Sequence, residues 1–243
     1  MKKLLLLAMI LLLTACGNDG NGSDTPDDET QEPTEESSEM ASDEGGATEA
    51  SEIVEEAEAA WGDTVSYEAR QTSTISSSEG QYAVRTITTR GEQNEIKVEV
   101  DDGRQIQTHY IVDGEHFIYQ EGNIEAQDQS LGLEGSTYGD LLTQLEPLSE
   151  GAVSEQDEGY EIRYEISSRE DTIPFFDDEV ESAIQDVGVF NGLVTVQFNE
   201  EYQYVGAELT LTVGSDQEEI NITSNISMDR IGEIDLIEKP KEM

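Results

Sequence analysis

Basic residues, cysteine and long apolar runs are scarce in this chain of 243 residues. It has 12 Lys and Arg against 56 Asp and Glu, which gives a formal net charge of −44. A surface of this sign repels phosphate backbones, so nucleic acid is excluded as a partner. A single cysteine, Cys16, excludes an intrachain disulfide. The apolar run from Leu4 to Leu13 is too short to span a bilayer comfortably.

Recognisable catalytic motifs are also lacking. The sequence contains no G-x-S-x-G, H-E-x-x-H or S-x-x-K motif and no phosphate-binding glycine loop. Its carboxylates are so numerous that no pair stands out as an acid and base couple. We therefore expect a protein that is not an enzyme and that needs no cofactor.

The N-terminus has the pattern of an export signal. Two lysines, Lys2 and Lys3, precede the apolar run, which ends in Leu13-Thr14-Ala15-Cys16. This segment resembles a bacterial lipoprotein signal, in which the cysteine is acylated and becomes the new N-terminus. The resemblance implies that residues 1–15 are a signal peptide. It also implies that Cys16 carries palmitate-like acyl chains, which anchor the protein on the extracytoplasmic face of the cell membrane, in a Gram-positive organism.

Residues 17–50 contain no Lys or Arg and almost no aliphatic side chains. Such a segment cannot bury enough apolar surface to offset its ordering entropy, so we expect a disordered, self-repelling tether behind Cys16. The acidity of the whole chain has two interpretations, capture of cations or basic ligands and solubility in a saline exterior. The even spread of the acids favours solubility.

Residues 51–238 are expected to form one domain, followed by a tail at 239–243. A helix opens it, because Ile53, Val54, Ala57, Ala60 and Trp61 share one face and Gly62 is a plausible stop. Two further amphipathic helices are predicted at residues 138–148 and 175–187.

Strands dominate the rest of the domain. Apolar and polar residues alternate at 95–100, 160–166, 194–198, 205–213 and 220–222, and turn residues such as Asp113-Gly114 separate the strands. Short connections predict a meander of about eight to ten antiparallel strands. The predicted fold is of the α+β class: a curved antiparallel sheet, or half-barrel, with the N-terminal helix and short helices covering its concave face.

Three segments carry a resemblance to a known family. They are the helix and strand from Ala50 to Tyr67, the hairpin from Ile111 to Tyr119, and the strand pair around Tyr202 to Leu209. They resemble lipoproteins of the LolA/LolB/LppX type, and the resemblance covers most of residues 51–238. It implies a half-barrel with helices in its mouth that holds lipid or acyl chains in its concavity.

The resulting hypothesis is a lipid-anchored protein that binds a lipid, acyl chain or other apolar ligand for carriage or sensing. The alternative is an interaction module of the cell envelope with a filled core and an acidic surface for a protein partner. Candidate ligand-binding residues are apolar and lie on the predicted helices and strands: Trp61, Phe175, Phe176, Ile184, Val196 and Leu209. The Ile173-Pro174-Phe175-Phe176 segment either plugs the open end of the sheet or forms a movable latch over a cavity.

Metal binding has only weak support. His109 and His116 lie on consecutive strands joined at Asp113-Gly114, so they could pair across the hairpin and hold zinc with Glu95, Glu99 or Glu115. Two exposed strand histidines need no such explanation, however. The acids at 101–102 and 177–179 lack the calcium-loop pattern. We expect no metal site.

Overall fold

The computed structural model describes residues 48–78, 80–127, 137–168, 189–214 and 219–239. The predicted N-terminal helix is α2 (Ala50–Trp61), and the helix predicted near residue 138 is α3 (Tyr138–Thr143), followed by the 3₁₀ helix η1 (Glu146–Glu150). The strands are β1 (Tyr67–Ser77), β2 (Gly80–Arg90), β3 (Ile96–Asp101), β4 (Ile106–Val112), β5 (Glu115–Gln120), β6 (Asn123–Gln127), β7 (Ala152–Gln156), β8 (Gly159–Ile166), β9 (Val189–Asn199), β10 (Tyr204–Gly214) and β11 (Glu219–Asp229).

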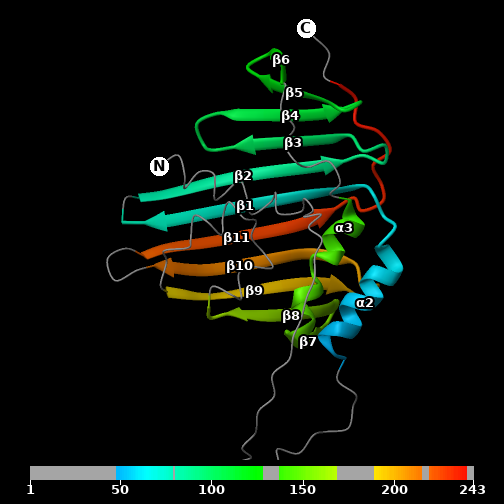
Figure 1. Ribbon diagram of the computed structural model, residues 1–243, viewed down its shortest axis with the longest axis vertical. Helices are drawn as coiled ribbons and strands as arrows, with labels where there is room; N and C mark the ends of the chain where they lie inside the picture. The colour runs from blue at the N-terminus through cyan, green and yellow to red at the C-terminus, as the bar shows by residue number, and fades with distance from the viewer. Residues whose placement is uncertain (1–47, 79, 128–136, 169–188, 215–218, 240–243) are drawn as a thin grey trace, which may run out of the picture.

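All strands belong to one open, curled antiparallel sheet in the order β6-β5-β4-β3-β2-β1-β11-β10-β9-β8-β7 (Figure 1). The chain starts at the middle of the sheet with β1 and winds outward to the β6 edge. It then crosses to the opposite edge at β7 and winds back, so that β11 pairs with β1. The sheet is therefore two meanders joined along one central pair of strands.

Tight turns join the strands at the β6 end of the first meander. Asp113 and Gly114 have φ of 55° and 75°, and Glu121 and Gly122 have φ of 51° and 87°. Two consecutive residues with positive φ give the hairpin turn that matches the twist of antiparallel strands. The turn predicted at Asp113-Gly114 is thus confirmed, as is the antiparallel α+β fold class.

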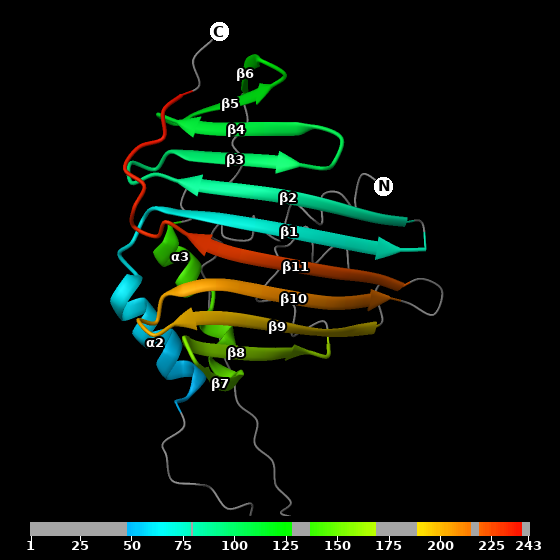
Figure 2. The same ribbon diagram turned by 180° about the vertical axis from the view of Figure 1, so that it is seen from behind.

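One face of the sheet, here called the inner face, carries the helices near one end of the strands (Figures 1 and 2). Helix α2 buries Ala50, Ile53, Val54 and Ala57 in a core shared with the strands. Leu142 of α3 and Leu148 of η1 are fully buried in the same core, and η1 contacts β8. The helices thus cover the inner face mainly over strands β7 to β11.

Four expectations need comment. The sheet has eleven strands, not eight to ten. Ala60 is exposed and lies off the buried face of α2. The helix expected over 138–148 ends at Thr143, because Pro147 has no backbone N–H to donate to the Thr143 carbonyl, and the chain continues as η1. The helix expected at 175–187 lies outside the described residues. In the described part of the chain, no helix has the length and apolarity needed to cross a membrane.

Candidate ligand-binding face

Two of the candidate binding residues lie on the inner face. Val196 of β9 is 1% exposed, and Leu209 of β10 is half-buried opposite Val194 and Ser224. Trp61 lies at the C-terminus of α2, where its indole N–H donates a hydrogen bond to the Glu201 carbonyl (2.9 Å). Cys16, Phe175, Phe176 and Ile184 lie outside the described residues.

Hydrogen bonds and a close backbone contact fix the helices at one end of the inner face. The Tyr138 hydroxyl donates to the Tyr204 carbonyl at 2.9 Å, and burial raises the pKa of this fully buried phenol. Gly139 donates its backbone N–H to Thr64 at 3.0 Å, beside the Gly62 carbonyl. These contacts hold α3 against both the end of α2 and the β9–β10 turn.

Buried polar side chains cross the other half of the inner face. The register of β11, β1, β2, β4 and β5 places them on the same side of the sheet as the apolar core. We call this set the polar band: Ser224, Ser73, Gln71, Thr86, Thr88, His109 and His116, all buried. On β3 the band is interrupted by Val98, which forms a small apolar cluster with Ile96 and Ile111.

Gln71 is the centre of the band. Its side-chain Nε2 donates to the hydroxyls of Ser224 (2.7 Å) and Ser73 (3.1 Å), and these two hydroxyls lie 2.9 Å apart. The residue is 2% exposed, yet its Oε1 has no hydrogen-bond partner among the described residues. A buried acceptor without a partner costs about 1–3 kcal/mol, so this atom is a candidate contact for a ligand.

The two histidines do pair across the β4–β5 hairpin. His109 Nδ1 lies 3.0 Å from His116 Nε2, and the rings stack with centroids 5.3 Å apart. Both side chains are buried, at 5% and 9% exposure, so the expectation of exposed histidines was wrong. Burial, together with the charge that His116 would carry, lowers the pKa of His109 to about 4. His109 is therefore neutral at pH 7, and within the described part of the chain its Nε2 has no hydrogen-bond partner.

The register separates these histidines from two of the glutamates considered as zinc ligands. Glu99 pairs with Thr108 and Glu115 with Val112, on the outer face of the sheet. Within the described ranges, no group of three or more His, Cys, Asp or Glu could hold a metal ion.

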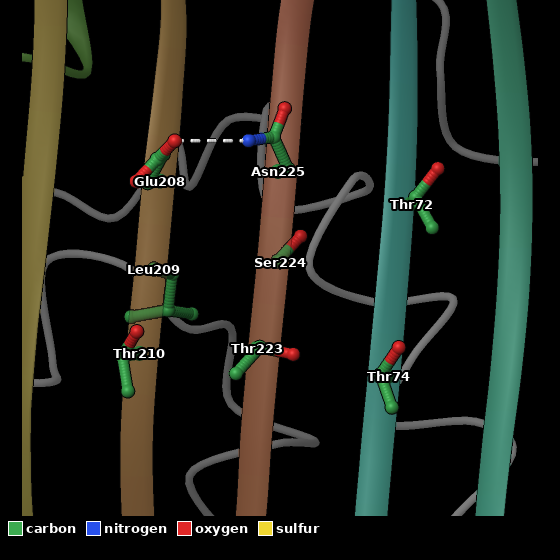
Figure 3. Close-up of a pocket in the computed structure, with 8 residues that line it drawn as sticks. All are labelled: Thr72, Thr74, Glu208, Leu209, Thr210, Thr223, Ser224 and Asn225. Carbon is green, nitrogen blue, oxygen red and sulfur yellow. Dashed lines mark hydrogen bonds between the residues drawn. The ribbon is translucent and has the colours of Figure 1, made fainter.

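A shallow depression of about 290 Å³ lies on the outer face, across β1, β11 and β10 (Figure 3). Its lining is mainly hydroxyl and amide groups: Thr72, Thr74, Glu208, Thr210, Thr223 and Asn225, with Leu209 and Ser224 completing it. Asn225 donates a hydrogen bond to Glu208 Oε1 at 3.1 Å. Such a polar, open surface does not suit an apolar ligand.

The polar band was missed because it breaks the alternation on which strand prediction depends. In β1 and β2, positions that face the core are occupied by Gln71, Ser73, Thr86 and Thr88. The sequence does contain a signal for the band, because these polar residues stand at every second position of segments rich in threonine. Threonine favours strands, and every second residue of a strand lies on the same face.

Comparison with known proteins gives likenesses of fold. No family model matches the chain, and no curated protein does. Among solved structures, it is similar to LprF from Mycobacterium bovis, with 9% identity and a TM-score of 0.45, covering 79% of this chain and 96% of LprF. It is also similar to a LolA superfamily protein from Nitrosomonas europaea, with 8% identity, a TM-score of 0.29 and coverage of 80% and 96%.

A third similar structure is a DUF1329 family protein from Desulfovibrio piger, with 7% identity and a TM-score of 0.26, covering 74% of this chain and 91% of that one. At these identities the likenesses concern the fold alone. The resemblance inferred from the sequence holds at that level: the chain forms an open, curled antiparallel sheet with helices on its inner face.

Proposed function

We propose that this protein is a non-enzymatic envelope lipoprotein whose curled sheet holds a lipid, an acyl chain or another apolar ligand on its inner face. The observation that carries the proposal is the uneven cover of that face. The described helices pack over β7 to β11, whereas the inner side chains of β2 to β5 are buried without a described helix against them.

The inner face has apolar side chains that are only half-buried: Val100, Leu209 and Ile226. Ile96, Val98 and Ile111 form a cluster separate from the main core, and Val84 of β2 lies on the same face. Removing apolar surface from water stabilises a complex by roughly 25 cal/mol per Å², so an apolar ligand that covers the half-buried side chains of this face would be retained. The outer depression lacks this property because threonine, asparagine and glutamate line it.

A dye titration tests the proposal. Nile red, a neutral apolar dye, should bind the wild-type chain, and Leu209→Trp should weaken binding about tenfold, because the larger ring occupies space on the inner face. Thr210→Trp is the matched control, since Thr210 is the next residue of β10 and is exposed on the outer face. The proposal fails if the wild type does not bind the dye, or if both variants weaken binding equally.

We also propose that Cys16 is the lipid anchor and that residues 17–50 are the tether, on the extracytoplasmic face of the cell membrane. The support is the sequence from Leu13 to Cys16 and the acidic composition that follows it. Cys16→Ser should leave the protein soluble or signal-bearing. Partition of this variant into detergent-phase membrane fractions to the wild-type extent would contradict the assignment.

A second candidate is the interaction module. It is favoured by one observation, the polar depression on the outer face, which is open to a macromolecular partner. If the wild-type chain binds neither the dye nor lipid, the interaction module becomes the better proposal.

A further inference from the structure

We infer that the inner face selects a neutral lipid with a free hydroxyl group over a pure hydrocarbon or an anionic lipid, with Gln71 as the residue that recognises the hydroxyl. This inference rests on the proposed function. It begins from the polar band, which places hydrogen-bonding groups where a sheet that held only hydrocarbon would carry aliphatic side chains.

The Gln71 side chain is held in place by its neighbours. Its amide nitrogen uses both hydrogens on the Ser73 and Ser224 hydroxyls, from strands on either side of the β1–β11 junction. Oε1 then remains as an acceptor whose geometry is fixed before any ligand arrives. A hydroxyl that donates to this oxygen would satisfy it, and because the amide is already ordered, little additional entropy is lost.

His109 supplies a second unpaired group on the same face. Its Nδ1 is engaged with His116, and no described residue forms a hydrogen bond with its Nε2. Gln71 and His109 lie on β1 and β4, three strand spacings or about 14 Å apart across the sheet. A ligand that contacts both must extend across the strands, as the polar end and first chain segment of a lipid would.

The charge of the band determines which polar group fits. Its members are Ser, Thr, Gln and a histidine pair in which His109 is kept neutral by burial. Arg90 at the end of β2 is a buried cation on the same face, but its guanidinium is already engaged, because Nη2 donates to Asn94 Oδ1 at 2.8 Å. With a net charge of −44 on the whole chain, an anionic head group is repelled, whereas a hydroxyl carries no such penalty.

The test uses the full chain with Cys16 replaced by Ser, and three probes that displace Nile red: oleyl alcohol, its methyl ether and oleate. The alcohol should bind about tenfold more tightly than the ether, which cannot donate a hydrogen bond, and more tightly than oleate. Gln71→Met, which keeps the length of the side chain, should abolish the preference over the ether. Thr72→Val, on the outer face of the same strand, should leave it unchanged.

Equal binding of alcohol and ether by the wild type would overturn the inference and leave the proposed function standing. Retention of the alcohol preference in Gln71→Met would also overturn it. Binding of none of the three probes by the wild type would overturn the inference together with the proposed function. The comparison of alcohol and ether in the wild type needs no variant, so it stands even where Gln71→Met fails to fold.

Discussion

At the scale of single residues, the informative feature is polarity in buried positions. Gln71, Ser73 and Ser224 bond to one another through the Gln71 amide nitrogen and the two hydroxyls. Among the described residues, Gln71 Oε1 and His109 Nε2 have no hydrogen-bond partner. Folded proteins pair the great majority of their buried polar atoms. Gln71 Oε1 and His109 Nε2 therefore call for an explanation, and a bound ligand would supply one.

His109 should make the stability of the protein depend on pH. Its pKa is about 4 in the folded state against an ordinary value of 6.5, so between these pH values the unfolded chain binds a proton that the folded chain does not. The stability associated with neutral His109 is thus complete above pH 6.5 and is lost as the pH falls towards 4. Lowering the pH from 7 to 5 should cost about 1–2 kcal/mol at this residue.

Urea unfolding of wild type and His109→Phe at pH 7, 6 and 5 measures this contribution. The phenylalanine ring keeps the stacking volume but cannot titrate, so the stability of the variant should decline less steeply with falling pH. Carboxylates titrate equally in both proteins and cancel in the difference. Parallel pH profiles for the two proteins would show that His109 does not contribute.

At the scale of elements, the position of the helices depends on a contact between two glycines. A Cβ on Gly139 would lie 1.8 Å from the Gly62 carbonyl oxygen, so only glycine lets α3 begin so close to the end of α2. The residue before Gly139 is Tyr138, whose hydroxyl donates to the Tyr204 carbonyl and so joins α3 to the sheet. A single methyl group added at Gly139 should therefore displace the helices that cover the inner face.

Gly139→Ala should lower the free energy of unfolding by about 2–3 kcal/mol, because the backbone of α3 must move away from α2. Gly103→Ala is a suitable control: Gly103 has a φ of 76° and open space around it, so its cost is limited to backbone strain of about 1–2 kcal/mol. Thermal unfolding followed by circular dichroism compares the two. Equal melting temperatures for both variants would contradict the close packing of the helices.

The elements also show what the sequence can and cannot predict. The alternation in β3, β8 and β10 and the Asp113-Gly114 turn predicted strands and hairpins correctly, since each depends on local sequence. The pairing of β1 with β11 joins residues more than 140 positions apart and has no local signal. The polar band was not predicted either, because strand patterns assume an apolar inner face.

At the scale of the whole molecule, charge dominates. Apart from the buried Arg90, the cations of the described strands lie on the outer face, where Arg70 pairs with Glu68 and Asp229, and Arg163 pairs with Glu161. Such exposed pairs contribute little each, so they offset only a small part of the repulsion among the acids. Repulsion among the acidic side chains should therefore lower the free energy of unfolding.

Salt should therefore stabilise the protein. The screening length falls from about 10 Å at 0.1 M to about 3 Å at 1 M, and each kcal/mol of repulsion relieved raises the melting temperature of a domain of this size by about 2–4 °C. Melting curves in 0.1 M and 1 M NaCl, with sucrose as an uncharged control for general solute effects, measure the increase. An unchanged melting temperature in salt would mean that the acids are already well dispersed.

A lipid-like ligand held on the inner face should be detectable by lipid extraction and mass spectrometry of the purified protein. The mature chain, purified without detergent from a bacterial host, should carry a stoichiometric neutral lipid with a free hydroxyl, and Leu209→Trp should carry markedly less than Thr210→Trp. The proposal that the inner face binds lipid would be wrong if the wild-type protein carried no lipid. It would also be wrong if both tryptophan variants retained lipid equally.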